Sequence, residues 1–340
     1  MVKAMIIDQL DPTLPFVRHP IVETLNLDEL EPGRPHRLRL TMTQNATGNE
    51  TLLPVIVARA EGEPTPVVGI TAAIHGNELN GMRVVQELSA SLSKDPSKLM
   101  RGTVIAVPLL NVPGYLNATR RFSDGVDLNR IMPGKPNGNE SELYAHRIMD
   151  RIIKHCDYLF DLHTASFGRV NTHYVRCDLS SPIVTELATK LEPQLILHSP
   201  NSDGTLRGAA AQLGIHALTV EIGDPQRIQR GMVREAYSGL TAALEHLGML
   251  EPTSASEPEE VLCCARSYWM YTERGGLLHV LPSLGERLKK GDEVARLRNV
   301  WGDLVGRFYA PEDSVVIGKS TNPTAGAGSR IVHLGIVGEP

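Results

Sequence analysis

The chain has 340 residues, a formal net charge of −5 at pH 7, 41% hydrophobic residues and 21% charged residues. This length predicts about two domains, and this composition supports a packed core, which excludes a predominantly disordered protein. The slightly acidic charge argues against a general binder of nucleic acids or anionic membranes. No apolar run reaches the ~20 residues that a membrane-spanning helix needs.

The cysteines and the N-terminal segment indicate a cytoplasmic protein. No C-x-x-C pair occurs, so reduced thiols are the simplest interpretation. Asp8, Asp11 and Pro12 interrupt the N-terminal segment before the apolar part of a signal peptide could form. We expect no nucleic-acid partner and no membrane partner, and a homo-oligomer stays open. The cysteines are Cys156, Cys177, Cys263 and Cys264.

The first 251 residues predict an α/β domain. Strand patterns occur in a lead-in that ends near residue 60, in HRLRLTMT and TLLPVIVARA. After Pro66, short apolar runs alternate with helical patterns, which is typical of a mostly parallel sheet with flanking helices. The runs are VVGITAAI (67–74), TVIAVPLL (103–110), DYLFDL (157–162), QLIL (194–197) and HALTVEI (216–222).

Three helices are predicted between these runs. Apolar residues from Leu79 to Leu92 recur at steps of three and four, which places them on one helix face. Asn139 and Glu142 have the spacing of a capping box at a helix start. A third amphipathic helix runs from Gly231 to Leu247 and ends at Gly248.

A second domain is predicted after a polar, Pro- and Ser-rich linker at residues 252–260. Residues 261–340 contain short strand patterns separated by Gly, Pro and Asp turns, which indicates a small all-β domain. Parts of it, LGERLKKGDEVARL and YAPEDSVVIG, resemble a biotinyl/lipoyl-type barrel-sandwich domain. No lysine stands in a Met-Lys-Met or Asp-Lys context, so we expect no covalently attached cofactor.

Polar residues gather where the predicted strands end. His75 and Glu78 follow one run, His163 follows another, and Glu221 lies at the end of a third. Because ligands of α/β sheets bind beyond the carboxyl ends of strands, we expect these side chains to meet. Two imidazoles and one carboxylate can hold zinc while leaving a coordination position for water, and Glu221 is suitably placed as a general base.

Less specific interpretations exist for each part of this site. A lone H-x-x-E is usually surface polarity of a helix, and twelve histidines make chance pairs common. The joint placement at several strand ends favours a metal site. In the loop 117–134, Asn129 and Arg130 could clamp a carboxylate, but a solvated basic loop would look the same.

The motifs HGNE, DLNR, DLHTA and TVEIG, in this order, resemble the succinylglutamate desuccinylase/aspartoacylase family of zinc carboxypeptidase-like deacylases. The resemblance extends from about Leu53 to Gly248, and the β-rich tail resembles the C-terminal domain of that family. It implies one zinc ion per chain, held by His75, Glu78 and His163. It also implies that Glu221 activates the zinc-bound water and later protonates the leaving amine.

The same resemblance implies roles for further residues. Asp127 would hold the ring of His75, and Asn129 and Arg130 would bind a substrate carboxylate. An arginine just before DLNR would stabilise the oxyanion; Arg120 and Arg121 both stand there, and we assign the role to Arg121. Two more substrate contacts are predicted. They are Arg207 and Asn111, the latter at the end of its strand.

The motifs and the resemblance thus predict a zinc-dependent amidohydrolase that acts on a small N-acyl amino acid, and by analogy with the family we expect the tail to restrict substrate size. Alternatives are a metallocarboxypeptidase acting on peptides and a non-catalytic metal- or ligand-binding protein, against which Glu221 argues. An interaction module centred on the tail is a third. The motifs leave open the acyl group, the amino acid, and Mn²⁺, Co²⁺ or Fe²⁺ in place of zinc.

Overall fold

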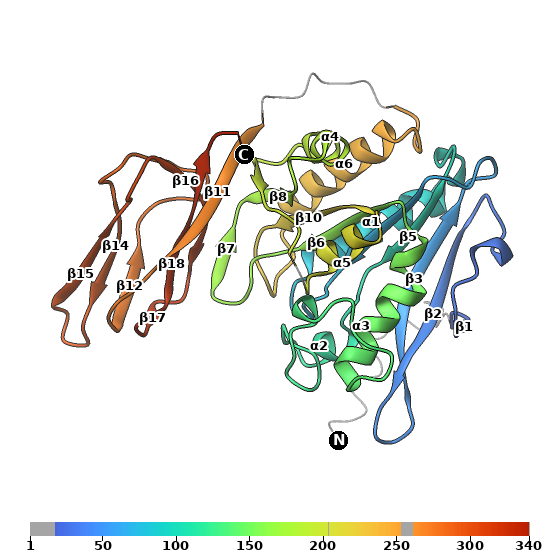
Figure 1. Cartoon of the computed structure of the whole chain (residues 1–340), viewed down its shortest axis with the longest axis horizontal. Helices are drawn as coiled ribbons and strands as arrows, with labels where there is room; N and C mark the ends of the chain where they lie inside the picture. Colours follow the sequence, from blue (N-terminus) through green and yellow to red (C-terminus); the bar gives the residue numbers. More distant parts are fainter. Residues whose placement is uncertain (1–17, 203, 253–260, 340) are drawn as a thin grey trace, which may run out of the picture.

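The computed structural model of the chain describes residues 18–202, 204–252 and 261–339. A large mixed sheet of 14 strands carries helices on both faces, and a four-stranded antiparallel sheet lies at the end of the molecule formed by the C-terminal residues (Figure 1). The predicted α/β class with an appended all-β part is therefore confirmed.

The large sheet has the order β1-β2-β3-β5-β4-β6-β10-β8-β9-β11-β18-β16-β13, and β7 pairs with β16. Its strands are β1 (Ile21–Val22), β2 (Pro35–Gln44), β3 (Glu50–Arg59), β4 (Val67–Ala72), β5 (Thr103–Val107), β6 (Tyr158–His163), β7 (Arg169–Asn171), β8 (His173–Cys177), β9 (Leu195–His198), β10 (His216–Ile222), β11 (Leu262–Tyr271), β13 (Arg287–Leu288), β16 (Ser314–Ser320) and β18 (Arg330–Val337).

The smaller sheet has the order β15-β14-β12-β17. Its strands are β12 (Gly276–Val280), β14 (Glu293–Arg298), β15 (Leu304–Tyr309) and β17 (Thr324–Ala325). The helices are α1 (Asn80–Lys94), α2 (Val112–Leu116), α3 (Glu140–Arg151), α4 (Pro182–Lys190), α5 (Leu206–Gln212) and α6 (Arg230–His246), with 3₁₀ turns at Leu27–Glu29, Pro96–Lys98, Leu128–Arg130 and Ile153–His155.

The centre of the large sheet is parallel, as predicted. Strands β5, β4, β6 and β10 run in the same direction, and the ends of β4, β6 and β10 supply residues of the candidate site. The sheet as a whole is mixed because β3 pairs antiparallel with β5, and β8 inserts antiparallel beside β10. The predicted lead-in hairpin β2–β3 is thus part of the same sheet.

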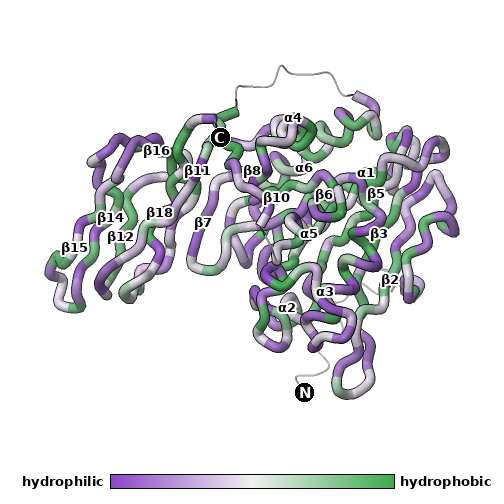
Figure 2. Tube along the Cα trace, viewed as in Figure 1, coloured by the Kyte–Doolittle hydropathy of each residue, from purple (hydrophilic) through white to green (hydrophobic). Residues whose placement is uncertain are grey.

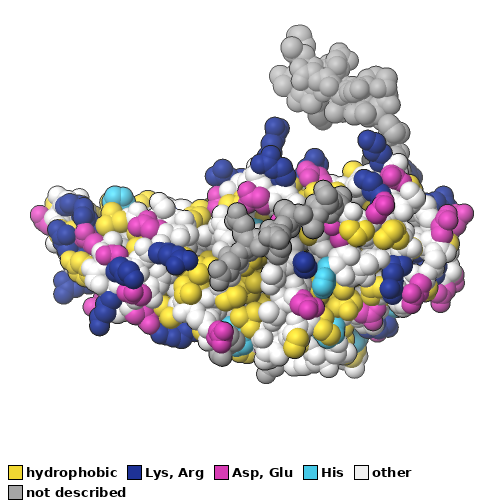
Figure 3. All heavy atoms as spheres, turned by 90° about the horizontal axis from the view of Figure 1, so that it is seen from above, with side chains coloured by type: hydrophobic (Ala, Val, Ile, Leu, Met, Phe, Trp, Pro, Cys, Tyr) yellow, Lys and Arg dark blue, Asp and Glu magenta, His cyan; other side chains and the backbone are white. Residues whose placement is uncertain are grey.

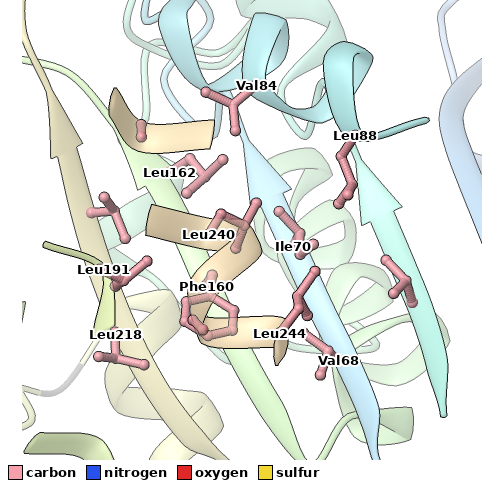
Figure 4. Packing of buried hydrophobic residues seen from close by; sticks show 14 of the residues in the cluster. Val68, Ile70, Val84, Leu88, Phe160, Leu162, Leu191, Leu218, Leu240 and Leu244 are labelled. Atoms are coloured by element: carbon pink, nitrogen blue, oxygen red, sulfur yellow. The ribbon is translucent and has the colours of Figure 1, made fainter. Parts of the chain in front are cut away.

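Two hydrophobic layers cover the faces of the sheet. One packs α1, α4 and α6 against it, and Figure 4 shows Val84, Leu88 and Leu240 of these helices lying over the strand residues Leu162, Ile70 and Phe160. The other packs α3 and α5 against the opposite face, to which β2 and β3 also contribute buried side chains. Figure 2 shows hydrophobic residues recurring along the central strands and the helices around them, as burial of apolar surface requires.

The predicted helices are present as α1, α3 and α6. At the start of α3, Glu142 donates its backbone N–H to the Asn139 side chain, and its carboxylate accepts from the Asn139 N–H, which completes the capping box. In the described part of the chain, every helix is too short or too polar to cross a bilayer. All four cysteines are free.

The large sheet continues from the α/β part into the C-terminal residues. Strand β9 pairs parallel with β11, and β7 pairs with β16. The small sheet packs on β16 and β18 through a shared apolar core, so the tail forms a sandwich. The described residues do not include residues 253–260, which are most of the predicted linker. They also do not include residues 1–16, for which the sequence predicts no signal peptide. The boundaries 1–251, 252–260 and 261–340 remain a prediction.

Candidate metal centre

His75, Glu78 and His163 form a compact cluster of donor atoms. Their nearest ligand atoms all lie within 4.8 Å of one another. His75 Nδ1 lies 2.9 Å from Glu78 Oε1, and His163 Nδ1 lies 3.1 Å from Glu78 Oε2. The three residues are 3%, 1% and 4% exposed. A carboxylate flanked by two imidazole nitrogens is a donor set that a divalent metal ion prefers.

The sheet explains why these residues meet. Strands β4 and β6 are parallel neighbours, with Ala72 opposite Leu162, so the residues that follow both strands leave the same edge. In the loop after β4, the Glu78 N–H donates to the His75 carbonyl, which folds the loop into a tight turn. Gly76 permits this turn, because a Cβ there would overlap the backbone of Gly114 and Tyr115.

Each histidine is held by an aspartate on the nitrogen remote from Glu78. His75 Nε2 lies 3.1 Å from Asp127 Oδ1, and His163 Nε2 lies 2.7 Å from Asp161 Oδ2. Such carboxylates fix the tautomer in which Nδ1 is free to bind a metal. His75 Nδ1 is buried, and its approach to Glu78 Oε1 lacks hydrogen-bond geometry, so this nitrogen fits a ligand position.

Electrostatics favours a cation in this cluster. Burial opposes ionisation of Glu78, but the contacts with His75 and His163 hold the pKa of its carboxyl group well below the usual range. Burial likewise opposes ionisation of Asp127, while His75 and Arg120 hold its pKa low. Glu78 and Asp127 therefore remain charged around the two histidines, where a divalent ion would compensate their charge.

Arg120 reaches this cluster, and Arg121 does not. The Arg120 guanidinium lies 3.0 Å from Glu78 Oε1 and 2.9 Å from Asp127 Oδ2. The Arg121 side chain is exposed and donates to the Gly125 carbonyl. The structure thus brings Arg120, and not Arg121, to the candidate metal ligands, which favours Arg120 for the proposed oxyanion role.

Glu221 lies beside the cluster on β10. In the sheet it is paired with His163 of β6, so both side chains leave the same strand edge. It is 12% exposed, Asn171 Nδ2 donates to it over 3.2 Å, and Arg176 Nε lies 3.7 Å away. Burial raises the pKa of its carboxyl group, although Arg176 opposes this shift. A carboxylate of raised pKa is a suitable proton acceptor near neutral pH.

The remaining predicted substrate contacts have different surroundings. Asn129 and Arg130 line the cavity, and Asn129 Oδ1 accepts from the Leu206 N–H at the start of α5. Arg207 also lines it, with its guanidinium on the Ser199 carbonyl and Asn201. Asn111 is the exception, because it is fully buried outside the cavity lining and accepts from the Gly114 N–H. It caps α2, so the structure does not bring it together with the other predicted substrate contacts.

The three candidate metal ligands, Arg120, Glu221 and the Asn129–Arg130 pair with Arg207 line one cavity of about 390 Å³. This volume lies at the small end of ligand pockets, which commonly measure ~300–1,000 Å³. Sequence reasoning missed the lining contributed by β7, β8, β11 and β18, since those strands reach the cavity only through long-range pairing. The missed lining residues include Ser166, Arg169, Asn171, Tyr174, Arg176, Ser267, Tyr268, Trp269, Arg330 and His333.

Known proteins resemble this chain in sequence and in fold. The catalytic-domain profile of the succinylglutamate desuccinylase/aspartoacylase family matches residues 64–247, more than half of the chain. An N-alpha-acetyl-L-2,4-diaminobutyric acid deacetylase from Halomonas elongata is 24% identical over 325 residues, 89% of this chain and 91% of that protein.

Two solved structures show the same fold at low sequence identity. The ectoine utilization protein EutE from Ruegeria pomeroyi superposes with a TM-score of 0.80 and 20% identity, covering 96% of this chain and 98% of that one. A metallo-carboxypeptidase from Burkholderia cenocepacia superposes with a TM-score of 0.50 and 19% identity, covering 62% and 65%. The carboxypeptidase-like architecture is therefore confirmed, and the likeness to EutE extends into the C-terminal part.

Proposed function

The chain belongs to the succinylglutamate desuccinylase/aspartoacylase family, and from that premise we propose that it hydrolyses the amide bond of a small N-acyl amino acid with one bound zinc ion. It is a hydrolase of this family. The observation that carries the proposal is the His75–Glu78–His163 cluster beside Glu221 in one small cavity. The substrate class is supported by the Halomonas relative, whose name describes an N-acetyl amino acid deacetylase.

The residues of the cavity divide the chemistry between them. His75, Glu78 and His163 would hold the metal, which when bound supplies a Lewis acid and lowers the pKa of water. Glu221 accepts the proton of the attacking water as the new C–O bond forms. It then returns that proton to the nitrogen as the amide C–N bond breaks, which gives a carboxylic acid and a free amine.

Arg120 would stabilise the oxyanion of the reaction, and the Asn129–Arg130 pair would bind the carboxylate of the substrate. Arg120 is held by Glu78 and Asp127, so its guanidinium is fixed beside the place where the carbonyl oxygen gains charge. Arg130 is exposed at the cavity rim and offers a planar fork to a substrate carboxylate, while the Asn129 amide lies beside it. Together these groups would fix an N-acyl amino acid across the metal.

A peptidase function is the alternative that the carboxypeptidase-like fold raises. The cavity argues for small substrates, because Tyr268, Trp269 and Arg330 from the C-terminal strands line it together with the candidate metal ligands. A long peptide would have to displace those strands. The four free cysteines support our further proposal of a reducing, cytoplasmic location.

The first experiment measures metal content and turnover together. Wild-type protein supplied with zinc should hold about one ion per chain and hydrolyse members of a panel of N-acetyl and N-succinyl amino acids, but not peptides of several residues. Glu221→Gln should retain the metal and lower kcat/KM about 10²–10⁴-fold. The His75→Ala/His163→Ala double variant should lose the metal.

Three results would contradict the proposal. Loss of zinc from Glu221→Gln would make Glu221 a ligand rather than a base. Absence of metal from the wild type after zinc addition would remove the basis of the mechanism. Efficient cleavage of peptides would favour the carboxypeptidase alternative instead.

A further inference from the structure

The C-terminal part reaches the proposed general base through strand β7. Figure 1 shows β7 lying beside the C-terminal strands, although its neighbours in the sequence, β6 and β8, belong to the α/β part. Figure 3 shows that basic and acidic side chains are interspersed over the described surface on one face of the molecule, so this face has no patch of one sign that would indicate a charged partner. An interior contact, and not a surface patch, thus connects the C-terminal part with the catalytic residues.

Asn171 makes this contact. It is the last residue of β7, lines the cavity and is 7% exposed. Its Nδ2 donates a hydrogen bond to Glu221 Oε2 over 3.2 Å. Among the described residues, no other side chain donates a hydrogen bond to this carboxylate, because Arg176 Nε approaches Oε1 only to 3.7 Å. The orientation of the Glu221 carboxylate therefore depends on one amide group.

Strand β16 of the C-terminal part holds Asn171 in place. In the antiparallel pairing of β7 with β16, Asn171 lies opposite Gly318. Next to this pair, Thr172 donates both its backbone N–H and its hydroxyl to the Ile317 carbonyl. In the sheet, β7 pairs with β16 and lies off the path that joins β4, β6 and β10. The C-terminal part thus fixes the backbone from which the Asn171 amide reaches Glu221.

Gly318 leaves room for the Asn171 amide. A Cβ at position 318 would overlap Asn171 Oδ1 and would lie 2.9 Å from the Val170 carbonyl oxygen. Both contacts are closer than the ordinary van der Waals separation, so a side chain here would displace the amide or the strand that carries it. The close approach of β16 to the Asn171 side chain therefore requires glycine at this position.

The chain is also anchored on the other side of Asn171, by the strand that carries Glu221. Two residues after Asn171, β8 begins with His173 opposite Ile222 of β10, and Tyr174 lies opposite Glu221 itself. The segment from β7 to β8 is therefore paired with β16 before the turn and with β10 after it. A hydrogen-bond donor whose backbone is held at both ends loses little freedom when it orients a neighbouring carboxylate.

We propose that Asn171 is a positioning residue: supported by Gly318 of the C-terminal part, its amide holds the Glu221 carboxylate in the orientation that accepts a proton from the attacking water. The inference rests on the proposed function, in which Glu221 is the base. It gives the C-terminal part a share in the chemistry beyond forming a wall of the cavity. A base acts only within hydrogen-bond reach of its proton, and a misplacement of about 1 Å can cost ~10²-fold in rate.

A kinetic test uses Asn171→Asp, which keeps the shape of the side chain but replaces the donor by a carboxylate that repels Glu221. On the best N-acyl substrate, kcat should fall about 10- to 100-fold. KM should change less than about threefold, since a positioning residue does not bind the substrate. In the Glu221→Gln background, Asn171→Asp should lower kcat less than about threefold further, because the group that it orients is already absent. An undiminished loss in that background, or a loss confined to KM, would overturn the positioning role.

Matched controls are available for the charge and for the support from β16. Asn137→Asp adds the same charge at an exposed position outside the cavity lining, so kcat and KM should stay unchanged. Gly318→Ala should lower kcat about 10-fold through Asn171, while zinc content stays at the wild-type value. Gly326→Ala should leave kcat unchanged, since a Cβ there meets nothing within 4 Å. Equal kcat values for Gly318→Ala and Gly326→Ala would overturn the support from the C-terminal part.

A stability test separates this inference from the proposed function, because it needs no turnover. In zinc-loaded protein at pH 8, Asn171→Asp should lower Tm by about 2–4 °C, since two carboxylates then face each other. Adding Glu221→Gln to Asn171→Asp exchanges donor and acceptor, so most of the lost Tm should return although activity does not. If Tm recovers in this way but no N-acyl amino acid is hydrolysed, Asn171 holds Glu221 as inferred and the proposed function fails alone. If hydrolysis is found but Asn171→Asp lowers Tm and kcat no more than Asn137→Asp, the positioning role fails alone.

Discussion

Orientation of the imidazoles depends on two aspartates that approach from different elements. Asp127 precedes the 3₁₀ turn Leu128–Arg130, whereas Asp161 lies on β6 two residues before His163. Residues two apart on a strand point to the same face, so the sequence D-L-H was sufficient to predict the contact between Asp161 and His163. The contact of Asp127 with His75, by contrast, spans 52 residues and was suggested only by the family resemblance.

The adjacent arginines of the loop provide a matched pair for testing oxyanion stabilisation. Arg120→Gln removes the guanidinium beside Glu78 and should lower kcat about 10²–10³-fold. Arg121→Gln removes only an exposed contact with the Gly125 carbonyl and should change kcat less than twofold. Steady-state kinetics on the best N-acyl substrate measures kcat for both variants. An equal loss of kcat in the two variants would reject the role given to Arg120.

The acid limb of the pH–rate profile should report Glu221. Its carboxyl group must be ionised to accept a proton, so kcat/KM should fall as the pH drops through its pKa, which burial raises. Arg176 opposes that rise. Arg176→Met should therefore move the acid limb to higher pH, whereas Arg287→Met, which removes an exposed arginine outside the cavity lining, should leave it in place. An acid limb that stays fixed or moves to lower pH in Arg176→Met would show that another group controls it.

At the level of secondary structure, the elements with strong local patterns were predictable. Buried parallel strands are continuous apolar runs, and the run at 216–222 coincides with β10. Strand β8 was missed because its sequence, HYVRC, carries polar His173 and Arg176 among its five residues. Helix α5 was missed because its seven residues, LRGAAAQ, are too short for a clear helical period.

The residues of the candidate site likewise fall into those that local sequence predicts and those that it does not. Metal ligands at strand ends follow from local sequence, because each strand end is marked by its own apolar run. The cavity wall at Trp269 could not be predicted, because Arg169 and Arg330 are 161 positions apart and meet only through the pairings β7–β16 and β11–β18. Nothing in either local sequence specifies these pairings.

The turn between β4 and α1 should be intolerant of a side chain at Gly76. An added Cβ would overlap the Gly114 and Tyr115 backbone, which cannot move aside as a flexible side chain could. Gly76→Ala should destabilise the protein by about 1–3 kcal/mol and weaken zinc binding, since the turn positions both His75 and Glu78. Thermal denaturation and competition with a zinc chelator measure the two effects.

Gly231 in the first turn of α6 serves as the control for that substitution. A Cβ there meets nothing within 4 Å, so Gly231→Ala should be neutral or stabilise by up to ~1 kcal/mol through helix propensity. If Gly76→Ala and Gly231→Ala had the same Tm, the turn at Gly76 would be able to rearrange. The close approach of Gly76 to the Gly114 and Tyr115 backbone would then not be needed to position His75 and Glu78.

Across the whole molecule, one sheet joins the two predicted domains. Besides the β9–β11 and β7–β16 pairings, a shared apolar cluster lies at the junction. Its buried members Tyr174, Leu195 and Leu197 come from the α/β part, and Cys264, Val315 and Ile317 come from the C-terminal part. Separating the parts would expose this cluster and leave β9 with an open edge.

We therefore expect the zinc-loaded chain to unfold as one cooperative unit. Differential scanning calorimetry should show one endotherm whose calorimetric and van't Hoff enthalpies agree. Ile317→Ala removes a fully buried side chain of the junction and should lower stability by about 2–5 kcal/mol. Because cooperativity couples the parts, the whole endotherm should move to lower temperature without splitting. Two endotherms in the wild type, or a shift of only one component in Ile317→Ala, would mean that the C-terminal part folds independently and that the cavity wall bearing Trp269 can move relative to the metal ligands.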